Sequence, residues 1–237
     1  MLKQWVIPDI HGCSKTLESL ILQIRPEKSD ELIFLGDYVD RGPDSKGVLD
    51  YVMNLQDEGY NVTAIKGNHE EFFVQAYEEA FVAKRRLFGK KYVVRKEWFL
   101  HGGKDTLKSF GTKDVKKVPE KYIKWMKNLP LYVEVGEFII VHAGLNFRIK
   151  NPFDDTHSML WAKEFTVKPE KINNRVVLHG HTPVSHEFIL ETIENSKEGF
   201  IDLDNGVYMP FRNGFGNLMA FELNSRDLIV QPNIDQE

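Results

Sequence analysis

Five short apolar runs recur along the chain, and polar residues and glycine follow each of them within a few positions. The runs are rich in branched and aromatic side chains and are bounded by Gly or Pro, which is typical of buried β-strands. The five runs are residues 5–7, 32–35, 62–65, 138–141 and 176–178. The pattern therefore predicts five strands in the core of the protein.

Between the first three runs, apolar residues recur at the spacing of an α-helix. Ser14 and Ser45 stand where they can cap two such helices, and Pro26 and Gly59 follow the predicted helix ends. The apolar faces would be formed by Leu17, Leu20, Ile21 and Ile24 in the first helix and by Val48, Leu49, Val52 and Met53 in the second. This β-α-β-α-β order predicts a layered α/β domain with largely parallel strands.

The stretch between the third and fourth runs has a helical rather than a strand-like pattern. We expect helices over residues 70–86 and 119–129, packed over or beside the strand ends. After residue 198 the pattern changes to short strand-like pieces with glycine turns. No linker composition, repeat or low-complexity segment divides the chain. The sequence thus predicts a single domain over residues 1–237, with a mainly helical insertion around 70–129.

The polar residues that follow the five runs form a set of metal-ligand types. Because side chains at the carboxyl ends of strands converge on one crevice, we expect these residues to lie together. Separate roles as loop caps or core hydrogen-bonding groups are the alternative, but six such residues at five strand ends favour one site. Carboxylate, amide and imidazole ligands suit hard or borderline divalent metals. The candidates are Asp9, His11, Asp37, Asn68, His142 and His181.

Two ions fit this set better than one, because Asp37 has two oxygens that can bridge them. The two ligand sets would be Asp9, His11 and Asp37 for one ion, and Asp37, Asn68, His142 and His181 for the other. Both sets leave positions open for water, which is typical of catalytic metal sites. With two coordinating aspartates and a bound hydroxide, the centre stays net positive and attracts an anion such as phosphate. Paired metals of this kind generate a hydroxide nucleophile for an in-line displacement, and Arg41 can grip phosphate oxygens.

The motifs around these residues resemble the signature series of the phosphoprotein phosphatase (PPP) family of calcineurin-like metallophosphoesterases. The resemblance extends from Asp9 to about Gly206 and is closest to the small bacterial and phage serine/threonine protein phosphatases. It implies a four-layer α/β/β/α sandwich with a dinuclear centre at one edge, most often occupied by Mn²⁺, although the ligands also permit Fe, Zn, Co or Ni. The motifs are Asp9-Ile10-His11-Gly12, Gly36-Asp37-Tyr38-Val39-Asp40-Arg41-Gly42, Gly67-Asn68-His69-Glu70, His142-Ala143-Gly144 and His179-Gly180-His181-Thr182-Pro183.

The resemblance also implies roles for residues around the ions. His69 would be the general acid that protonates the leaving oxygen, and Asp40 would orient its ring, as a poor alkoxide leaving group requires. Arg41 would bind the phosphate, and Asn68 would contact both metal and phosphate.

One position departs from the pattern. Small bacterial members carry a second phosphate-binding arginine just after a Leu/Ile-Trp pair, whereas this chain has Lys163 at that place. Lysine offers a point charge and no planar fork, so the grip on phosphate would differ. Arg148 and Arg175 are the alternatives for this role.

Three functions follow from this set of residues. The first is a serine/threonine protein phosphatase, a hydrolase of phosphate esters that also accepts small aryl phosphates. A symmetrical diadenosine-tetraphosphate hydrolase would use the same centre, and a basic run over residues 84–96 could draw in such a polyanion or be a solvated helix face. A non-catalytic metal-binding interaction module is the alternative from another class, which the retained His69 and Asp40 disfavour.

Composition narrows the partners and the compartment. The net charge of −4 disfavours general nucleic-acid binding, which usually needs a basic face. A single cysteine permits no internal disulfide, and the chain has neither a signal pattern nor an apolar stretch of membrane-spanning length. We therefore expect a cytoplasmic protein that acts on phosphoprotein or small phosphate-ester substrates, without a membrane partner. The sequence gives no indication of the oligomeric state.

Overall fold

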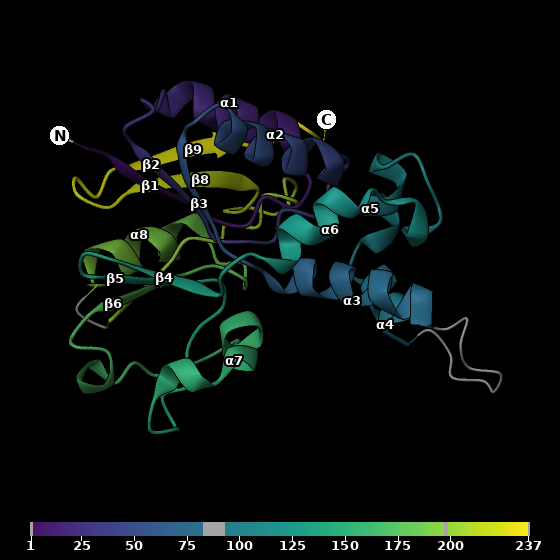
Figure 1. Cartoon of the computed structure of the whole chain (residues 1–237). Helices are drawn as coiled ribbons and strands as arrows, with labels where there is room; N and C mark the ends of the chain where they lie inside the picture. The colour runs from purple at the N-terminus through teal and green to yellow at the C-terminus, as the bar shows by residue number, and fades with distance from the viewer. Residues whose placement is uncertain (1, 83–92, 197–198, 237) are drawn as a thin grey trace.

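Two β-sheets form the centre of the computed structural model, which describes residues 2–82, 93–196 and 199–236 (Figure 1). The first sheet has the order β3-β2-β1-β8-β9, with parallel pairing among β1, β2 and β3 and antiparallel pairing of β8 to β1 and to β9. Its strands are β1 Gln4–Ile7, β2 Glu31–Phe34, β3 Asn61–Ala64, β8 Asn217–Glu222 and β9 Leu228–Pro232. The first three predicted strands are therefore neighbours in one sheet, and their carboxyl ends lie at one edge.

The second sheet has the order β4-β5-β6-β7, in which β4 alone is antiparallel to its neighbour. Its strands are β4 Tyr132–Val135, β5 Phe138–Val141, β6 Val176–His179 and β7 Phe200–Asp202. The fourth and fifth predicted strands are thus β5 and β6. β4 was not predicted. The strands β7, β8 and β9 agree with the strand-like pattern that the sequence shows after residue 198.

Alternate residues of the central strands pack on opposite sides, as the two-residue period of a strand requires. Val6 and Ile33 of the first sheet meet Ile140 and Leu178 of the second in a buried core between the sheets. Helices α1 Ser14–Ile24 and α2 Ser45–Asp57 cover the outer face of the first sheet, and α7 Thr156–Trp161 packs on the outer face of the second (Figure 1). The predicted α/β/β/α layering is confirmed.

The caps of α1 and α2 differ from the sequence-based prediction by one residue. Cys13 occupies the N-cap position of α1 without a side-chain bond, and the Ser14 hydroxyl donates to Asp44 instead. Asp44, rather than Ser45, caps α2 by accepting a hydrogen bond from the backbone N–H of Gly47 at 2.8 Å. The prediction that Ser14 and Ser45 are the caps is wrong, because both hydroxyls have tertiary partners that a local pattern does not reveal.

In the described part of the stretch between β3 and β4, four α-helices gather at one side of the sheets (Figure 1). They are α3 Asn68–Val82, α4 Val93–Leu100, α5 Gly103–Ser109 and α6 Glu120–Lys127. The helices predicted over 70–86 and 119–129 correspond to α3 and α6, although residues 83–86 lie outside the described part. Most of the basic run over residues 84–96 also lies outside it.

The remaining helix, α8 His186–Glu194, contributes Ile189 to the core between the sheets. Within residues 2–82, 93–196 and 199–236, no helix combines the length and the apolarity that crossing a bilayer requires.

Candidate metal centre

Asp37 lies at the centre of the site, on the loop that follows β2. Its backbone has a φ of 51°, and a Cβ added to the preceding Gly36 would lie 2.4 Å from the backbone nitrogen of Gly67. The two motif loops therefore pack backbone against backbone, which only glycine permits. The buried Glu70 carboxylate joins the loops by accepting hydrogen bonds from the backbone N–H groups of Asp37 and Tyr38, both at 2.8 Å, and of Gly67 at 2.9 Å.

Three histidines surround the carboxylate of Asp37, which is 1% exposed. One oxygen lies 3.5 Å from His142 Nε2, and the other lies 3.5 Å from His11 Nε2 and 3.9 Å from His69 Nε2. Each oxygen of Asp37 thus faces a different group of nitrogen atoms. This is the arrangement that a carboxylate bridging two ions requires.

Asn68 joins the group on one side of Asp37. Its Oδ1 lies 2.9 Å from both His142 Nε2 and His181 Nδ1, and these two nitrogens are 3.2 Å apart. One ligand atom from each of Asp37, His142 and His181 falls within a 4.8 Å cluster, and so does one from each of His11, Asp37 and His69. Residues from both sheets therefore meet at this edge.

The tautomers of His11 and His142 follow from their backbone partners. His11 Nδ1 donates to the carbonyl oxygen of Val39, and His142 Nδ1 donates to that of Leu35, each at 2.9 Å. Burial lowers the pKa of both imidazoles, so that both rings are neutral near pH 7. Each Nε2 then presents a lone pair toward Asp37, which is itself an acceptor.

These converging lone pairs fit divalent cations. Acceptors that face one another without a proton between them repel, and a cation between them reverses the sign of the interaction. Ligand atoms bound to one ion at about 2.1 Å are roughly 3–3.5 Å apart, which matches the separations around Asp37 and Asn68. Burial lowers the pKa of His181 to about 3, which keeps that ligand neutral as well. The His/Asp cluster can therefore hold metal, although its geometry does not identify the element.

Asp9 lies at the edge of this cluster rather than within it. Both of its carboxylate oxygens are 3.2 Å from the backbone nitrogen of His181, so they share one N–H in a long, bifurcated hydrogen bond. Burial, followed by the neighbouring carboxylates of Asp204 and Asp37, raises the pKa of Asp9. The charge of Asp9 is thus poorly compensated by the protein, and its lone pairs are only partly used.

His69 and Asp40 form a buried pair beside the cluster. His69 Nδ1 donates to Asp40 Oδ2 at 2.7 Å, which leaves Nε2 facing the centre. Although burial acts to lower it, the charge of Asp37 and the hydrogen bond to Asp40 raise the pKa of His69. His11, His142 and His181 have lowered pKa values by contrast, so His69 is the one histidine of these four that the site favours in its protonated form.

Two residues without a predicted role hold Asp40. Trp98 Nε1 donates to Asp40 Oδ2 at 2.9 Å, and the Thr106 hydroxyl donates to Oδ1. They lie 58 and 66 positions after Asp40, on α4 and α5, in a stretch with no recognisable motif. No spacing rule could have connected them to the aspartate, since the link exists only in the folded helices.

Arg41 stands beside His11 with its charge largely unused. Its Nη1 is buried without a hydrogen-bond partner among the described residues, and its guanidinium lies 4.2 Å from the ring centroid of Tyr208. A Cβ on Gly102 would lie 2.4 Å from the backbone nitrogen of Arg41, so this glycine lets the α5 entrance approach the loop. A buried, unpaired guanidinium is suited to an anionic ligand. Neither Tyr208 nor Gly102 was singled out for such a role from the sequence.

The proposed second cation is not part of this arrangement. Lys163 is exposed just beyond α7 and has no side-chain hydrogen bond or ion pair in the part of the chain that the structure describes. Of its alternatives, Arg175 forms an ion pair with Glu134 on β4, and Arg148 is exposed on the loop after β5. None of the three contacts the cluster.

Comparisons with known proteins identify a family and several relatives of this chain. The family model for calcineurin-like phosphoesterase matches residues 2–207 of the chain. A symmetrical bis(5'-nucleosyl)-tetraphosphatase from Ralstonia nicotianae is 32% identical over 140 residues, which are 59% of this chain and 41% of that protein. Serine/threonine-protein phosphatase 1 from Salmonella typhimurium is 41% identical over 73 residues, which are 30% of this chain and 32% of that protein. The chain thus matches less than half the length of either relative.

A solved structure gives a similar fold along the whole chain. A protein serine/threonine phosphatase from Saccharomyces cerevisiae has a TM-score of 0.66 and 15% sequence identity, and the match covers 100% of this chain and 81% of that one. At this level of identity the likeness concerns the fold alone.

Proposed function

The chain belongs to the calcineurin-like phosphoesterase family, and from this premise we propose that it is a metal-dependent hydrolase of phosphate esters. The observation that carries the proposal is the buried His69–Asp40 pair beside the lone pairs that converge on Asp37. A metal site alone could serve structure, whereas a histidine of raised pKa aimed at it supplies a proton donor.

We propose two ion sites with the ligands that the sequence predicts. One ion would be held by Asp9, His11 and Asp37, and the other by Asp37, Asn68, His142 and His181. The long, bifurcated hydrogen bond that Asp9 accepts leaves lone pairs for this role. Divalent ions at these sites would lower the pKa of water and polarise a phosphoryl oxygen. Mn²⁺ is the metal we expect, and metal analysis of the purified protein tests that choice.

The protein's own groups would perform the remaining steps. Arg41 would bind the phosphoryl oxygens through its unpaired Nη1, and Asn68 would contact both ion and phosphate. His69 would give the proton on Nε2 to the leaving oxygen, while Asp40 holds the Nδ1–H side of the ring. Lys163 would need to turn toward the centre to bind phosphate, so its role remains a prediction.

Two substrate classes are compatible with this chemistry. A phosphoserine or phosphothreonine protein releases a poor alkoxide leaving group, which the His69–Asp40 pair could protonate. The Salmonella typhimurium relative carries the name of such an enzyme. A dinucleoside tetraphosphate is the second candidate, since the Ralstonia nicotianae relative is named for it.

Hydrolysis assays on three substrates test the proposal. Metal-stripped and Mn²⁺-loaded protein would be compared on p-nitrophenyl phosphate, a phosphothreonine peptide and diadenosine tetraphosphate. We expect Mn²⁺-dependent release of phosphate from p-nitrophenyl phosphate, and the preferred natural-type substrate assigns the class. A protein that binds metal but is inert on all three would contradict the proposed function and favour a non-catalytic metal-binding module.

A further inference from the structure

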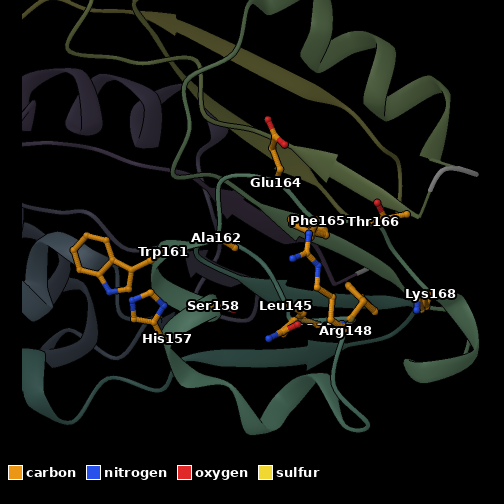
Figure 2. A pocket seen from close by; sticks show the side chains of 12 residues that line it. Leu145, Arg148, His157, Ser158, Trp161, Ala162, Glu164, Phe165, Thr166 and Lys168 are labelled. Atoms are coloured by element: carbon orange, nitrogen blue, oxygen red, sulfur yellow. Dashed lines mark hydrogen bonds between the residues drawn. The ribbon is translucent and has the colours of Figure 1, made fainter.

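A cavity of about 730 Å³ lies beside α7, on the side of the second sheet (Figure 2). Three segments border it: the loop after β5, helix α7, and the loop that follows α7. Its apolar walls include Leu145, Phe147, Trp161 and Phe165. We call it the α7 cavity. Its volume falls within the range of about 300–1,000 Å³ that is usual for small-molecule sites.

The α7 cavity begins close to the metal centre along the chain. His142 belongs to the second group of ligand atoms, and Leu145, three residues later, already lines the cavity. Three residues of extended chain span at most about 11 Å, which bounds the distance between their Cα atoms. The backbone N–H of Ala143 donates to the carbonyl of Met159 at 2.9 Å, so this segment is tied directly to α7.

A series of ring contacts gives a second connection. The ring of Trp161 lies 4.8 Å from that of Phe72, Phe72 stacks on His101 at 5.3 Å, and His101 lies 6.1 Å from His69. Ring contacts therefore lead from the cavity wall to His69, the proposed general acid. A ligand lying in the cavity could extend along these rings into the centre.

Two cations complete the lining. Arg148 and Lys168 are exposed, and neither side chain has a hydrogen bond or ion pair with any described residue. Lys163 lies between residues 162 and 164, which both line the cavity. The lining also contains one carboxylate, that of Glu164, so Arg148 and Lys168 leave a net positive charge beside the aromatic walls.

We propose that the α7 cavity binds a nucleobase of a nucleoside polyphosphate whose phosphate chain reaches the metal centre. The inference rests on the proposed hydrolase function and assigns its substrate class. Trp161 and Phe165 would provide the flat apolar surfaces on which a base stacks. Arg148 and Lys168 would pair with phosphate charges that lie beyond the ions.

A peptide fits this cavity less well. Peptides are commonly held along a free strand edge or in an apolar groove that receives a helix. The cavity lining comes from α7 and two loops, with no strand among its described residues. Its walls offer ring faces and cations, which match a base and a polyphosphate.

Kinetic comparison of charge variants tests the assignment. Arg148→Ala and Lys168→Ala would be measured on diadenosine tetraphosphate, a phosphothreonine peptide and p-nitrophenyl phosphate. The matched control is Lys150→Ala, which removes an exposed cation from the same loop as Arg148 but outside the cavity lining. We expect KM for the dinucleotide to rise about tenfold in each cavity variant, as for loss of one charge-assisted contact, with Lys150→Ala unchanged. The ratio of kcat/KM for the dinucleotide to that for p-nitrophenyl phosphate should fall in both cavity variants and remain that of the wild type in Lys150→Ala, and circular dichroism of all three verifies folding.

Binding of AMP provides a readout that does not depend on turnover. AMP should quench the tryptophan fluorescence of the wild-type protein, and Trp161→Phe should remove that response while retaining a ring in the wall. An unchanged dinucleotide KM in both cavity variants would overturn the inference, and so would a rise in KM for the phosphopeptide alone. Activity on p-nitrophenyl phosphate separates these outcomes from failure of the proposed function, which would abolish turnover of every substrate.

Discussion

The metal centre and the α7 cavity are neighbouring regions that are built in opposite ways. In the centre, Asp37 is 1% exposed, and its loop is held by the buried Glu70. In the cavity, Arg148 and Lys168 are exposed, and no described residue pairs with their side chains. The residues of the metal centre are therefore held in place before a ligand binds, whereas the charged side chains of the α7 cavity would become ordered when the ligand binds.

This difference separates reaction chemistry from substrate choice. A proton donor and metal ligands must be held accurately, and each residue proposed for these roles has at least one partner within the fold. A binding wall can tolerate side-chain freedom, since it needs only to favour one substrate over another. Substitutions in the centre should therefore reduce turnover of every substrate, whereas substitutions in the cavity should change the preference among substrates.

The largest expected effect follows from Asp37→Asn. The amide removes the charge that faces both groups of nitrogens, so that neither ion keeps its bridging carboxylate. We expect loss of bound metal together with loss of activity on all substrates. Metal content measured by mass spectrometry on the purified variant, beside activity on p-nitrophenyl phosphate, tests this. Arg148→Ala is the control from the other region and should retain full metal content; equal metal loss in both variants would erase the distinction.

His69→Asn should have the next largest effect, and it acts on chemistry alone. Removal of a general acid lowers kcat by about 10²–10⁴-fold, while the proposed ligand set stays complete and metal binding is retained. The loss should be greater for a phosphothreonine peptide than for p-nitrophenyl phosphate, because nitrophenolate leaves without much help from a proton.

The pH profile checks the role of His69 independently. A general acid works in its protonated form, and Asp37 and Asp40 raise the pKa of His69 against the effect of burial. Activity that depends on this proton is present at low pH and falls as pH rises through the raised pKa. That alkaline fall should be absent in His69→Asn. A variant that lost metal, or that kept the wild-type profile, would refute the assignment.

The strands could be predicted from the sequence because their signal is local. Each of the five apolar runs became a strand that starts within one residue of its predicted start, and β5 begins at Phe138 as expected. β4 was missed because Tyr132–Val135 mixes a charged residue into a partly exposed edge strand. The caps of α1 and α2 were assigned wrongly because their partners depend on tertiary contacts.

The residues of the candidate site likewise differ in whether a local sequence signal could reveal them. Asp37, Asn68 and the histidines follow strands directly, so their convergence could be expected from parallel strand ends. Trp98 and Thr106 could not be found, because only the packing of α4 and α5 brings them to Asp40. The α7 cavity was also invisible, since its walls come from loops whose residues share no period or motif.

Trp98→Phe should have an intermediate effect. It tests whether a residue that contacts Asp40, and not the proposed metal ligands, contributes to the activity of the centre. Phenylalanine can keep the stacking on Phe73, where the ring centroids are 4.7 Å apart, but it removes the N–H that binds Asp40. Loss of a partner that orients a functional group typically costs about 10–100-fold. We expect a reduced kcat with an unchanged KM for p-nitrophenyl phosphate and unchanged metal content. A kcat equal to that of the wild type would show that Thr106 and His69 suffice to hold Asp40.

Asp235→Ala should have the smallest effect. It tests whether helix α1, which follows His11, can be destabilised without changing the activity of the metal centre. The Asp235 carboxylate accepts hydrogen bonds from the backbone N–H groups of Lys15 at 3.1 Å and Thr16 at 2.8 Å, so it caps α1 from the other end of the chain. Loss of such a cap costs about 1 kcal/mol, which lowers Tm by roughly 2–4 °C in a chain of this size. Asp235→Asn keeps an accepting oxygen and should recover much of that stability. Because α1 begins only three residues after His11, the cap could also help to hold the metal centre in place. A loss of metal affinity in Asp235→Ala would show that it does. An unchanged kcat would show that the geometry of the centre depends only on the residues around Asp37.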